Sequence, residues 1–299
     1  MDGSRLLQLI DEFKQLGVFD VTLAGGEPSL HPQILEIIHR CVNAKIRVGM
    51  LSNGIALDEK MVAELERITN RQNFILQISI DSTNPEVNDA GRGKTRDVLG
   101  TLERLRHSSL QVQLACVIHK RNLATAHLLI DSYYPDIKRY HFLNIQRTAQ
   151  ALKHPELLIE EGDALRFWLH LNEYAKRFPE DLFLPSLRIQ MRALGRAEVD
   201  PEASLHRGAT FECASCSAGW SHINITSTFD VLGCDIAKDF TKMGNVFERS
   251  FESVWNSPEA ERVRQAPFPA CYKIEGPKGD KLEDSLKPEY VQTSANSIL

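Results

Sequence analysis

Two glycines, a carboxylate and a proline follow one another near the start of the chain, as Gly25-Gly26-Glu27-Pro28. The preceding stretch 18–23 is rich in β-favouring residues, which predicts a buried strand that ends at the glycines. Glycine permits positive φ and lets a ligand approach the main chain, and proline ends strand pairing. We therefore expect a ligand at this strand end, although an ordinary strand-to-helix turn would use the same residue types.

Cysteine sulfur, the ligand that zinc and iron–sulfur clusters prefer, is concentrated in the last third of the chain. Four of the six cysteines lie there: Cys213, Cys216, Cys234 and Cys271. Residues 223–233 predict a short β-hairpin that folds the third of these thiols back beside the second. The cluster predicts a metal site, zinc or iron–sulfur, over a disulfide or four unrelated thiols.

Five apolar strands alternate with amphipathic helices in the first half of the chain. The strands are predicted at residues 18–23, 45–53, 74–81, 111–119 and 139–146. Parallel strands joined by right-handed helical crossovers curl into a barrel-like sheet. The sequence therefore predicts an α/β protein with its ligands at the carboxyl ends of the strands.

Polar residues stand at the ends of two later strands, and we expect them to lie at the same edge of the sheet as Glu27. Asn53 ends the second predicted strand, before a glycine that signals a turn. Ser79 and Asp81 belong to the polar face of the third strand, which indicates a lined cavity. The alternative is that Asp81 caps a turn and Ser79 is satisfied in the core.

Composition narrows the class of protein. The chain has 299 residues, 42% of them hydrophobic, and a net charge of −5, which suits one large α/β domain or such a domain with a smaller companion. No block of lysine and arginine predicts a nucleic-acid partner. No signal peptide and no apolar run of about 20 residues is present, so we expect no membrane partner and a cytoplasmic location.

The motif Gly25-Gly26-Glu27-Pro28, placed after a strand in a β/α series, resembles the radical S-adenosylmethionine (SAM) enzymes. The resemblance implies a (β/α)6 partial TIM-like barrel in which the first strand is missing from this sequence. It also implies a Cys-x3-Cys-x2-Cys loop before residue 1. We expect the chain to be N-terminally truncated, with its catalytic [4Fe-4S] cluster forming only if that segment is restored.

The same resemblance implies which residues bind SAM. The two glycines and Glu27 would hold the amino group of the methionine part. Ser79 and Arg92 would contact its carboxylate or the ribose, since a guanidinium is the natural fork for a carboxylate. Asn53, Asp81 and Leu143 would support the site, the last beside the adenine.

The C-terminal third is similar to the SPASM/twitch extension of these enzymes. The matching segments are residues 216–219, the hairpin that ends at Cys234, residues 243–246 and residues 250–256. Phe229 stands where the hairpin usually has glycine. The resemblance implies one auxiliary [4Fe-4S] cluster on Cys216, Cys234 and Cys271, with Cys213 as the fourth ligand or a bystander.

Two hypotheses follow for the function. The first is a radical SAM enzyme that produces a 5′-deoxyadenosyl radical and abstracts hydrogen from a peptide or small molecule, with an electron donor as partner. The second is a non-catalytic relative, an iron–sulfur or zinc protein that acts by interaction. The sequence leaves open whether the chain as written is an enzyme, because it lacks the triple-cysteine loop. The predicted division is a barrel at 1–150, a helical connection at 151–208, the extension at 209–275 and a disordered tail at 276–299.

Overall fold

The computed structural model describes residues 1–145, 151–187, 219–234 and 241–265. The chain forms two compact units. One comprises residues 17–209, and the other joins residues 1–16 to residues 210–299. The predicted four-part division stays a prediction.

The larger unit is built on a parallel sheet of five strands whose spatial order is their order along the chain. The strands are β1 (Asp20–Leu23), β2 (Arg47–Ser52), β3 (Phe74–Ser79), β4 (Val112–Ile118) and β5 (Arg139–Asn144). Such a singly wound order curves a sheet toward a barrel and brings all the carboxyl strand ends to one edge. The five predicted strands are confirmed.

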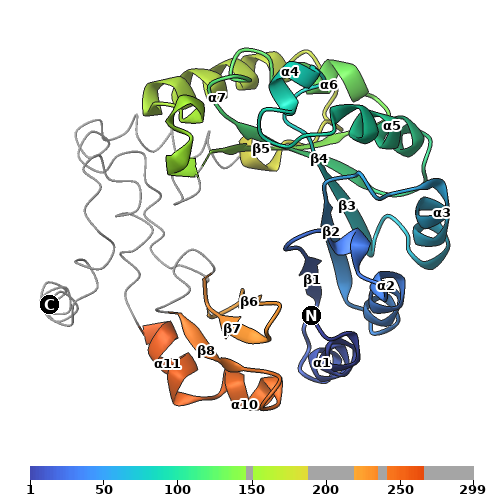
Figure 1. Ribbon diagram of the computed structural model, residues 1–299, viewed down its shortest axis with the longest axis vertical. Coiled ribbons are helices and arrows are strands. Elements are labelled where there is room, and N and C mark those ends of the chain that lie inside the picture. The colour runs from blue at the N-terminus through green and yellow to red at the C-terminus, as the bar shows by residue number, and fades with distance from the viewer. Residues whose placement is uncertain (146–150, 188–218, 235–240, 266–299) are drawn as a thin grey trace, which may run out of the picture. The chain divides into compact units, whose positions relative to one another are not determined.

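Helices cover the outer side of this curved sheet (Figure 1). They are α2 (Ile34–Asn43), α3 (Glu59–Ile68), α4 (Pro85–Asn88), α5 (Thr95–Arg106), α6 (Leu128–Tyr133) and α7 (Glu161–Ala175), with short 3-10 helices at Pro28–Leu30, Ala151–Lys153 and Pro155–Leu157. The strands alternate buried and half-exposed residues, as one apolar face requires. The buried set includes Met50, Leu76, Ile78, Leu114, Tyr140 and Phe142.

The sheet is extended beyond β5 by a single parallel bridge to Phe183. The Tyr140 main-chain N–H donates to the Phe183 carbonyl at 3.0 Å, and the Phe183 N–H donates to the Lys138 carbonyl at 2.7 Å. This bridge pairs main-chain groups of the β5 edge that would otherwise need another partner. Its position after α7 was not predicted from the sequence.

The smaller unit contains an antiparallel sheet of β6 (Asn224–Ile225), β7 (Asp230–Leu232) and β8 (Lys242–Asn245), followed by α10 (Phe251–Trp255) and α11 (Pro258–Gln265). The predicted hairpin is confirmed by the pairing of Ile225 with Val231. Phe229 has a φ of +65°, in the left-handed region, which explains why glycine would suit its position. Its ring is buried and lies 5.5 Å from the ring of Phe247.

The first helix, α1 (Gly3–Gln15), belongs to this smaller unit. The Arg5 Nε donates to the Val246 carbonyl at 2.7 Å, and the Phe251 N–H donates to the Glu12 carboxylate. Phe13 packs edge-on against Phe251, with ring centroids 5.1 Å apart. Segments at the two ends of the chain therefore share one small core. Among the described residues, no helix is both long and apolar enough to cross a membrane.

Candidate functional site

The Glu27 carboxylate joins the turn after β1 to the carboxyl end of β2. Its Oε1 accepts from the Ser29 N–H at 3.1 Å, the Ser29 hydroxyl at 2.6 Å and the Ser52 hydroxyl at 2.8 Å. Its Oε2 accepts from the Asn53 N–H at 2.7 Å. The carboxylate is therefore occupied by the protein, which leaves the main chain of this turn as the part that can meet a ligand.

The two glycines before Glu27 are exposed and have free space around them. A Cβ built on Gly25 or Gly26 would meet no atom within 4 Å in the described part of the chain. Gly25 also has a φ of +105°, which side chains with a Cβ rarely adopt. Pro28 starts the short 3-10 helix that follows. The turn therefore offers an uncovered main chain held in place by the Glu27 side chain.

We expect Glu27→Ala to lower the free energy of unfolding by about 2–3 kcal/mol, because it leaves the Ser52 hydroxyl and Asn53 N–H without their acceptor. Glu27→Gln keeps one acceptor oxygen and is expected to cost less than Glu27→Ala. Urea unfolding measures both. Glu64→Ala, which removes only the exposed pair with Arg67, is the matched control and should show no resolvable change. Equal stability of Glu27→Ala and the control would contradict this role.

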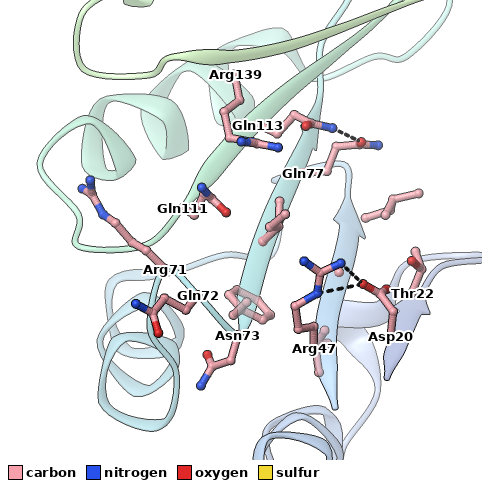
Figure 2. A pocket seen from close by; sticks show the side chains of 15 residues that line it. Asp20, Thr22, Arg47, Arg71, Gln72, Asn73, Gln77, Gln111, Gln113 and Arg139 are labelled. Carbon is pink, nitrogen blue, oxygen red and sulfur yellow. Dashed lines mark hydrogen bonds and ion pairs between the residues drawn. The ribbon is translucent and has the colours of Figure 1, made fainter. Parts of the chain in front are cut away.

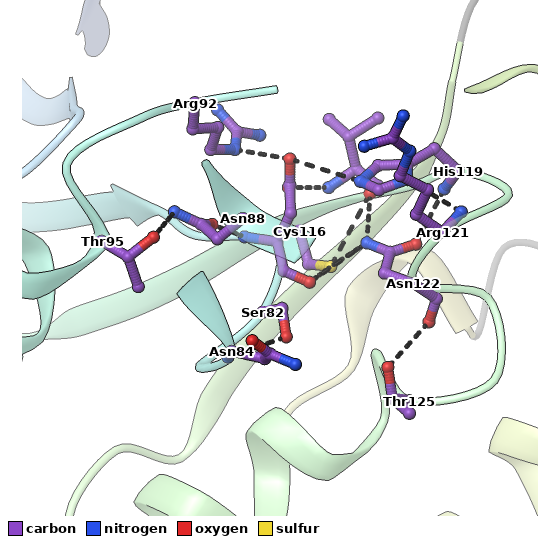
Figure 3. A network of polar contacts seen from close by, with 12 residues as sticks. Ser82, Asn84, Asn88, Arg92, Thr95, Cys116, His119, Arg121, Asn122 and Thr125 are labelled. Atoms are coloured by element: carbon purple, nitrogen blue, oxygen red, sulfur yellow. Dashed lines mark hydrogen bonds and ion pairs between the residues drawn. The ribbon is translucent and has the colours of Figure 1, made fainter. Parts of the chain in front are cut away.

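Asp81 follows β3 and is the centre of a polar network at the carboxyl ends of β3 and β4. Figure 3 shows its neighbours Asn88, Arg92 and Asn122. Its Oδ1 accepts from the Val117 N–H at 2.8 Å, and its own N–H donates to Asn88 Oδ1 at 2.8 Å. The Asn122 side-chain amide donates to the Asp81 carbonyl at 3.1 Å and to the Val117 carbonyl at 2.8 Å. Through these bonds Asp81 ties the ends of β3 and β4 to each other and to the segment at Asn122.

The Asp81 carboxylate also fixes Arg92. The Arg92 Nε lies 2.8 Å from Asp81 Oδ2, an ion pair whose angle falls short of a hydrogen bond. The Asp81 side chain is 6% exposed and that of Arg92 is 27% exposed. No described residue accepts a hydrogen bond from the two terminal nitrogens of Arg92, so they remain able to bind an anion.

The two remaining predicted residues lie on separate strands. Ser79 is the last residue of β3, is half-exposed and makes no side-chain hydrogen bond to another described residue. Leu143 lies near the end of β5, is 39% exposed and pairs in register with Val117. The structure thus brings Glu27 to Asn53 and Asp81 to Arg92, but it shows no direct contact between these pairs.

Sequence reasoning missed His119, which follows β4 and is buried beside Asp81. Its Nε2 lies 4.0 Å from Asp81 Oδ2 and has no hydrogen-bond partner in the described structure. Burial lowers the pKa of His119 below its usual value, although the neighbouring Asp81 opposes this effect. Its place at the end of a predicted strand was the signal that could have found it.

Only one of the four predicted metal ligands lies within the described residues. Cys234 follows β7 and is half-exposed, and its main chain is bound to the Thr241 hydroxyl at both N–H (3.1 Å) and carbonyl (2.8 Å). Cys213, Cys216 and Cys271 lie outside the described residues. Within the described ranges no three His, Cys, Asp or Glu side chains form a metal-binding group. The ligand set stays a prediction.

A separate cavity of about 340 Å³ lies on the inner face of the sheet, toward the amino ends of the strands (Figure 2). Its lining mixes apolar residues such as Leu51 and Ile75 with polar ones. The polar ones form a Gln77–Gln113 hydrogen bond of 2.7 Å and an Arg47–Asp20 ion pair of 2.7 Å. None of the predicted SAM-binding residues lines it. The cavity and the predicted site therefore occupy different ends of the strands.

A parallel sheet wound in chain order, with a glycine turn and an Asp–Arg pair at its carboxyl edge, matches a known family. Residues 1–132 match the model of the radical SAM superfamily, and residues 216–273 match that of the SPASM domain, an iron–sulfur cluster-binding domain. The chain belongs to the radical SAM superfamily. More specifically, it is a radical SAM protein with a C-terminal SPASM domain. The predicted family and the predicted partial-barrel fold with its extension are confirmed.

Relatives share this arrangement at low sequence identity. The chain is 23% identical to the antilisterial bacteriocin subtilosin biosynthesis protein AlbA of Bacillus subtilis, covering 87% of this chain and 55% of AlbA. It is 23% identical to the PqqA peptide cyclase of Granulibacter bethesdensis, covering 85% and 65%. The chain thus spans less than two thirds of the length of each.

Solved structures of Streptococcus suis SuiB are similar in fold. The structure bound to S-adenosylmethionine gives a TM-score of 0.70 at 16% identity, over 89% of this chain and 61% of SuiB. The structure bound to the precursor peptide SuiA gives a TM-score of 0.68 at 17% identity, over 89% and 60%. At this identity the likeness concerns the fold alone.

Proposed function

We propose that the protein is a radical SAM enzyme that binds SAM at the carboxyl edge of the sheet and acts on a peptide. The observation that carries the proposal is Arg92, held by Asp81 through Nε with both terminal nitrogens unoccupied among the described residues. These donors suit the carboxylate of the methionine part of SAM. The amino group of SAM needs hydrogen-bond acceptors. The main chain at Gly25 and Gly26 can supply them, because no Cβ covers it.

The other predicted residues take supporting parts. Ser79 would donate its hydroxyl to the carboxylate or ribose, and Asn53 would complete the turn that Glu27 holds. Leu143, exposed near the end of β5, would pack against the adenine. When SAM and a reduced [4Fe-4S] cluster are bound, they supply a radical that abstracts hydrogen from the substrate, and the protein orients the reactants.

The cysteines of this sequence are proposed to hold the auxiliary cluster alone. The predicted auxiliary [4Fe-4S] cluster would be held by Cys213, Cys216, Cys234 and Cys271, whose soft sulfur donors fit it. None of the six cysteines forms a Cys-x3-Cys-x2-Cys motif, so no residue of this sequence is assigned to the catalytic cluster. The role proposed for the residues at the carboxyl edge of the sheet is to bind and orient SAM and the substrate.

The substrate class is inferred from the relatives. One is named a PqqA peptide cyclase, and SuiB has been solved with its precursor peptide. A peptide is therefore the proposed substrate, and an electron donor is the proposed partner because SAM cleavage is reductive.

Calorimetric titration with SAM tests the proposal on this chain. Arg92→Ala should weaken binding by about 1.5–3 kcal/mol, the range for a lost hydrogen bond to a charged group. Arg92→Lys should recover only part, because a point charge cannot make the bidentate contact. Arg67→Ala, which removes an exposed arginine on α3, is the control and should bind normally.

Two results would count against the proposal. Binding that is insensitive to Arg92 would show that the carboxylate is held elsewhere. Absence of SAM binding in a well-folded protein would favour the other hypothesis, a non-catalytic iron–sulfur or zinc protein that acts by interaction.

A further inference from the structure

His119 is a buried titratable residue that none of the assigned roles uses. Its side chain is 5% exposed, and the charged groups around it are Asp81, Arg92 and Arg121. Asn122, three residues further on, donates to the Val117 carbonyl and accepts from the His119 main-chain N–H at 2.8 Å. The main chain at His119 is therefore held by the same network that holds Asp81 (Figure 3).

The hydrogen bonds of the ring define its tautomer. The Arg121 main-chain N–H donates to His119 Nδ1 at 3.2 Å, so Nδ1 carries the lone pair. A neutral ring then has its proton on Nε2. Nε2 is buried and has no acceptor within hydrogen-bond distance among the described residues. Its nearest carboxylate oxygen is Asp81 Oδ2 at 4.0 Å.

Two donors thus approach one oxygen of Asp81. Oδ1 is anchored by the Val117 N–H, while Oδ2 lies 2.8 Å from Arg92 Nε and 4.0 Å from His119 Nε2. A carboxylate that binds the terminal nitrogens of Arg92 shares the guanidinium charge with Asp81. That competition weakens the Asp81–Arg92 attraction and leaves Oδ2 in need of another donor.

We propose that His119 is a positioning residue for Arg92: its Nε2–H is the donor that closes on Asp81 Oδ2 when a carboxylate ligand binds Arg92. The role of SAM as that ligand rests on the function proposed above. His119 acts through Asp81 and does not touch the ligand. Without it, the Asp81 carboxylate has no compensating donor, and Arg92 loses its fixed orientation.

Nuclear magnetic resonance of protein labelled with ¹⁵N in histidine and arginine tests this without and with SAM. We expect a proton on His119 Nε2 and none on Nδ1, identified as the signal missing from His119→Leu. The Arg92 Nε–H signal should be equally sharp in both proteins without SAM; with SAM bound it should stay sharp in the wild type and broaden in His119→Leu. A proton on Nδ1, or an Arg92 signal that stays sharp in the variant with SAM bound, would overturn the inference.

Affinity for SAM supplies the second test. His119→Leu should weaken binding about tenfold, the size of one lost hydrogen bond, and His119→Gln, which keeps a side-chain N–H, should recover part of it. In an Arg92→Ala background, His119→Leu should cause no further loss, because its effect passes through Arg92. An equal loss in both backgrounds would overturn the inference.

Tyr140→Phe is the matched control, since it removes a buried hydroxyl that donates to the Ile137 carbonyl at 2.7 Å in the same unit. It should lower stability and leave SAM affinity unchanged. If His119→Leu behaves in the same way, the residue is only structural. If the wild type binds no SAM, the proposed function fails, and the Arg92 Nε–H signal measured with acetate, a plain carboxylate, decides the role of His119.

Discussion

Asp81→Asn is expected to lower the free energy of unfolding by about 3 kcal/mol and to abolish measurable SAM binding. The change removes the buried charge that lies 2.8 Å from Arg92 Nε. It can also turn the NH₂ of the new amide toward two other donors, Arg92 Nε and His119 Nε2. The estimate is the lower end of the range for breaking a buried pair, because Arg92 is partly exposed. Urea unfolding measures the first effect and calorimetry the second.

The control for Asp81→Asn is Asp136→Asn. Asp136 pairs with Arg106 at 2.7 Å near the surface, and the loss of such a pair should cost less than about 1 kcal/mol. It should not change SAM affinity. If Asp81→Asn were no less stable than this control, or if it bound SAM normally, Asp81 would not organise the site.

Cys234→Ala is expected to remove most of the iron from protein purified without oxygen. The wild type should be brown, because four thiolates in the SPASM region are predicted to hold an auxiliary [4Fe-4S] cluster, and a cluster that lacks one thiolate is poorly held. Cys216→Ala should have the same effect. Iron and sulfide per chain, together with visible absorption, measure the loss.

Cys41→Ala is the matched control for removal of a cysteine. Cys41 is fully buried on α2, and burial raises the pKa of its thiol to about 12, so it supplies no thiolate. Its variant should keep its iron. Stoichiometric zinc without iron or sulfide in the wild type would contradict the cluster and leave a structural metal site.

Local patterns in the sequence were sufficient for the five strands of the larger unit and for the hairpin of the smaller one. The alternation in residues 74–81 follows from the pleat of β3, because one face packs on helices and the other does not. The hairpin before Cys234 was likewise predicted from short strands and turn residues. The glycine turn at Gly25 could be found because only glycine adopts its φ of +105° easily.

The partners of the polar side chains were decided by the tertiary structure. The Glu27 carboxylate binds Ser52 and Asn53, 25 and 26 residues away, while the SAM contact of this residue stays a prediction. No periodicity encodes such a contact, because it depends on the register of β1 against β2.

Two other features depend on the fold in the same way. Asp81 follows β3 and His119 follows β4, so the two meet only when these strands pair, and the sequence could not show that they are neighbours. Phe229 adopts a positive φ although it is not glycine, and its buried ring packs on Phe247. The sequence by itself determined the family, the strands and the glycine turn. The tertiary structure decided which polar groups remain free, because that depends on which groups distant in sequence form hydrogen bonds with them in the fold.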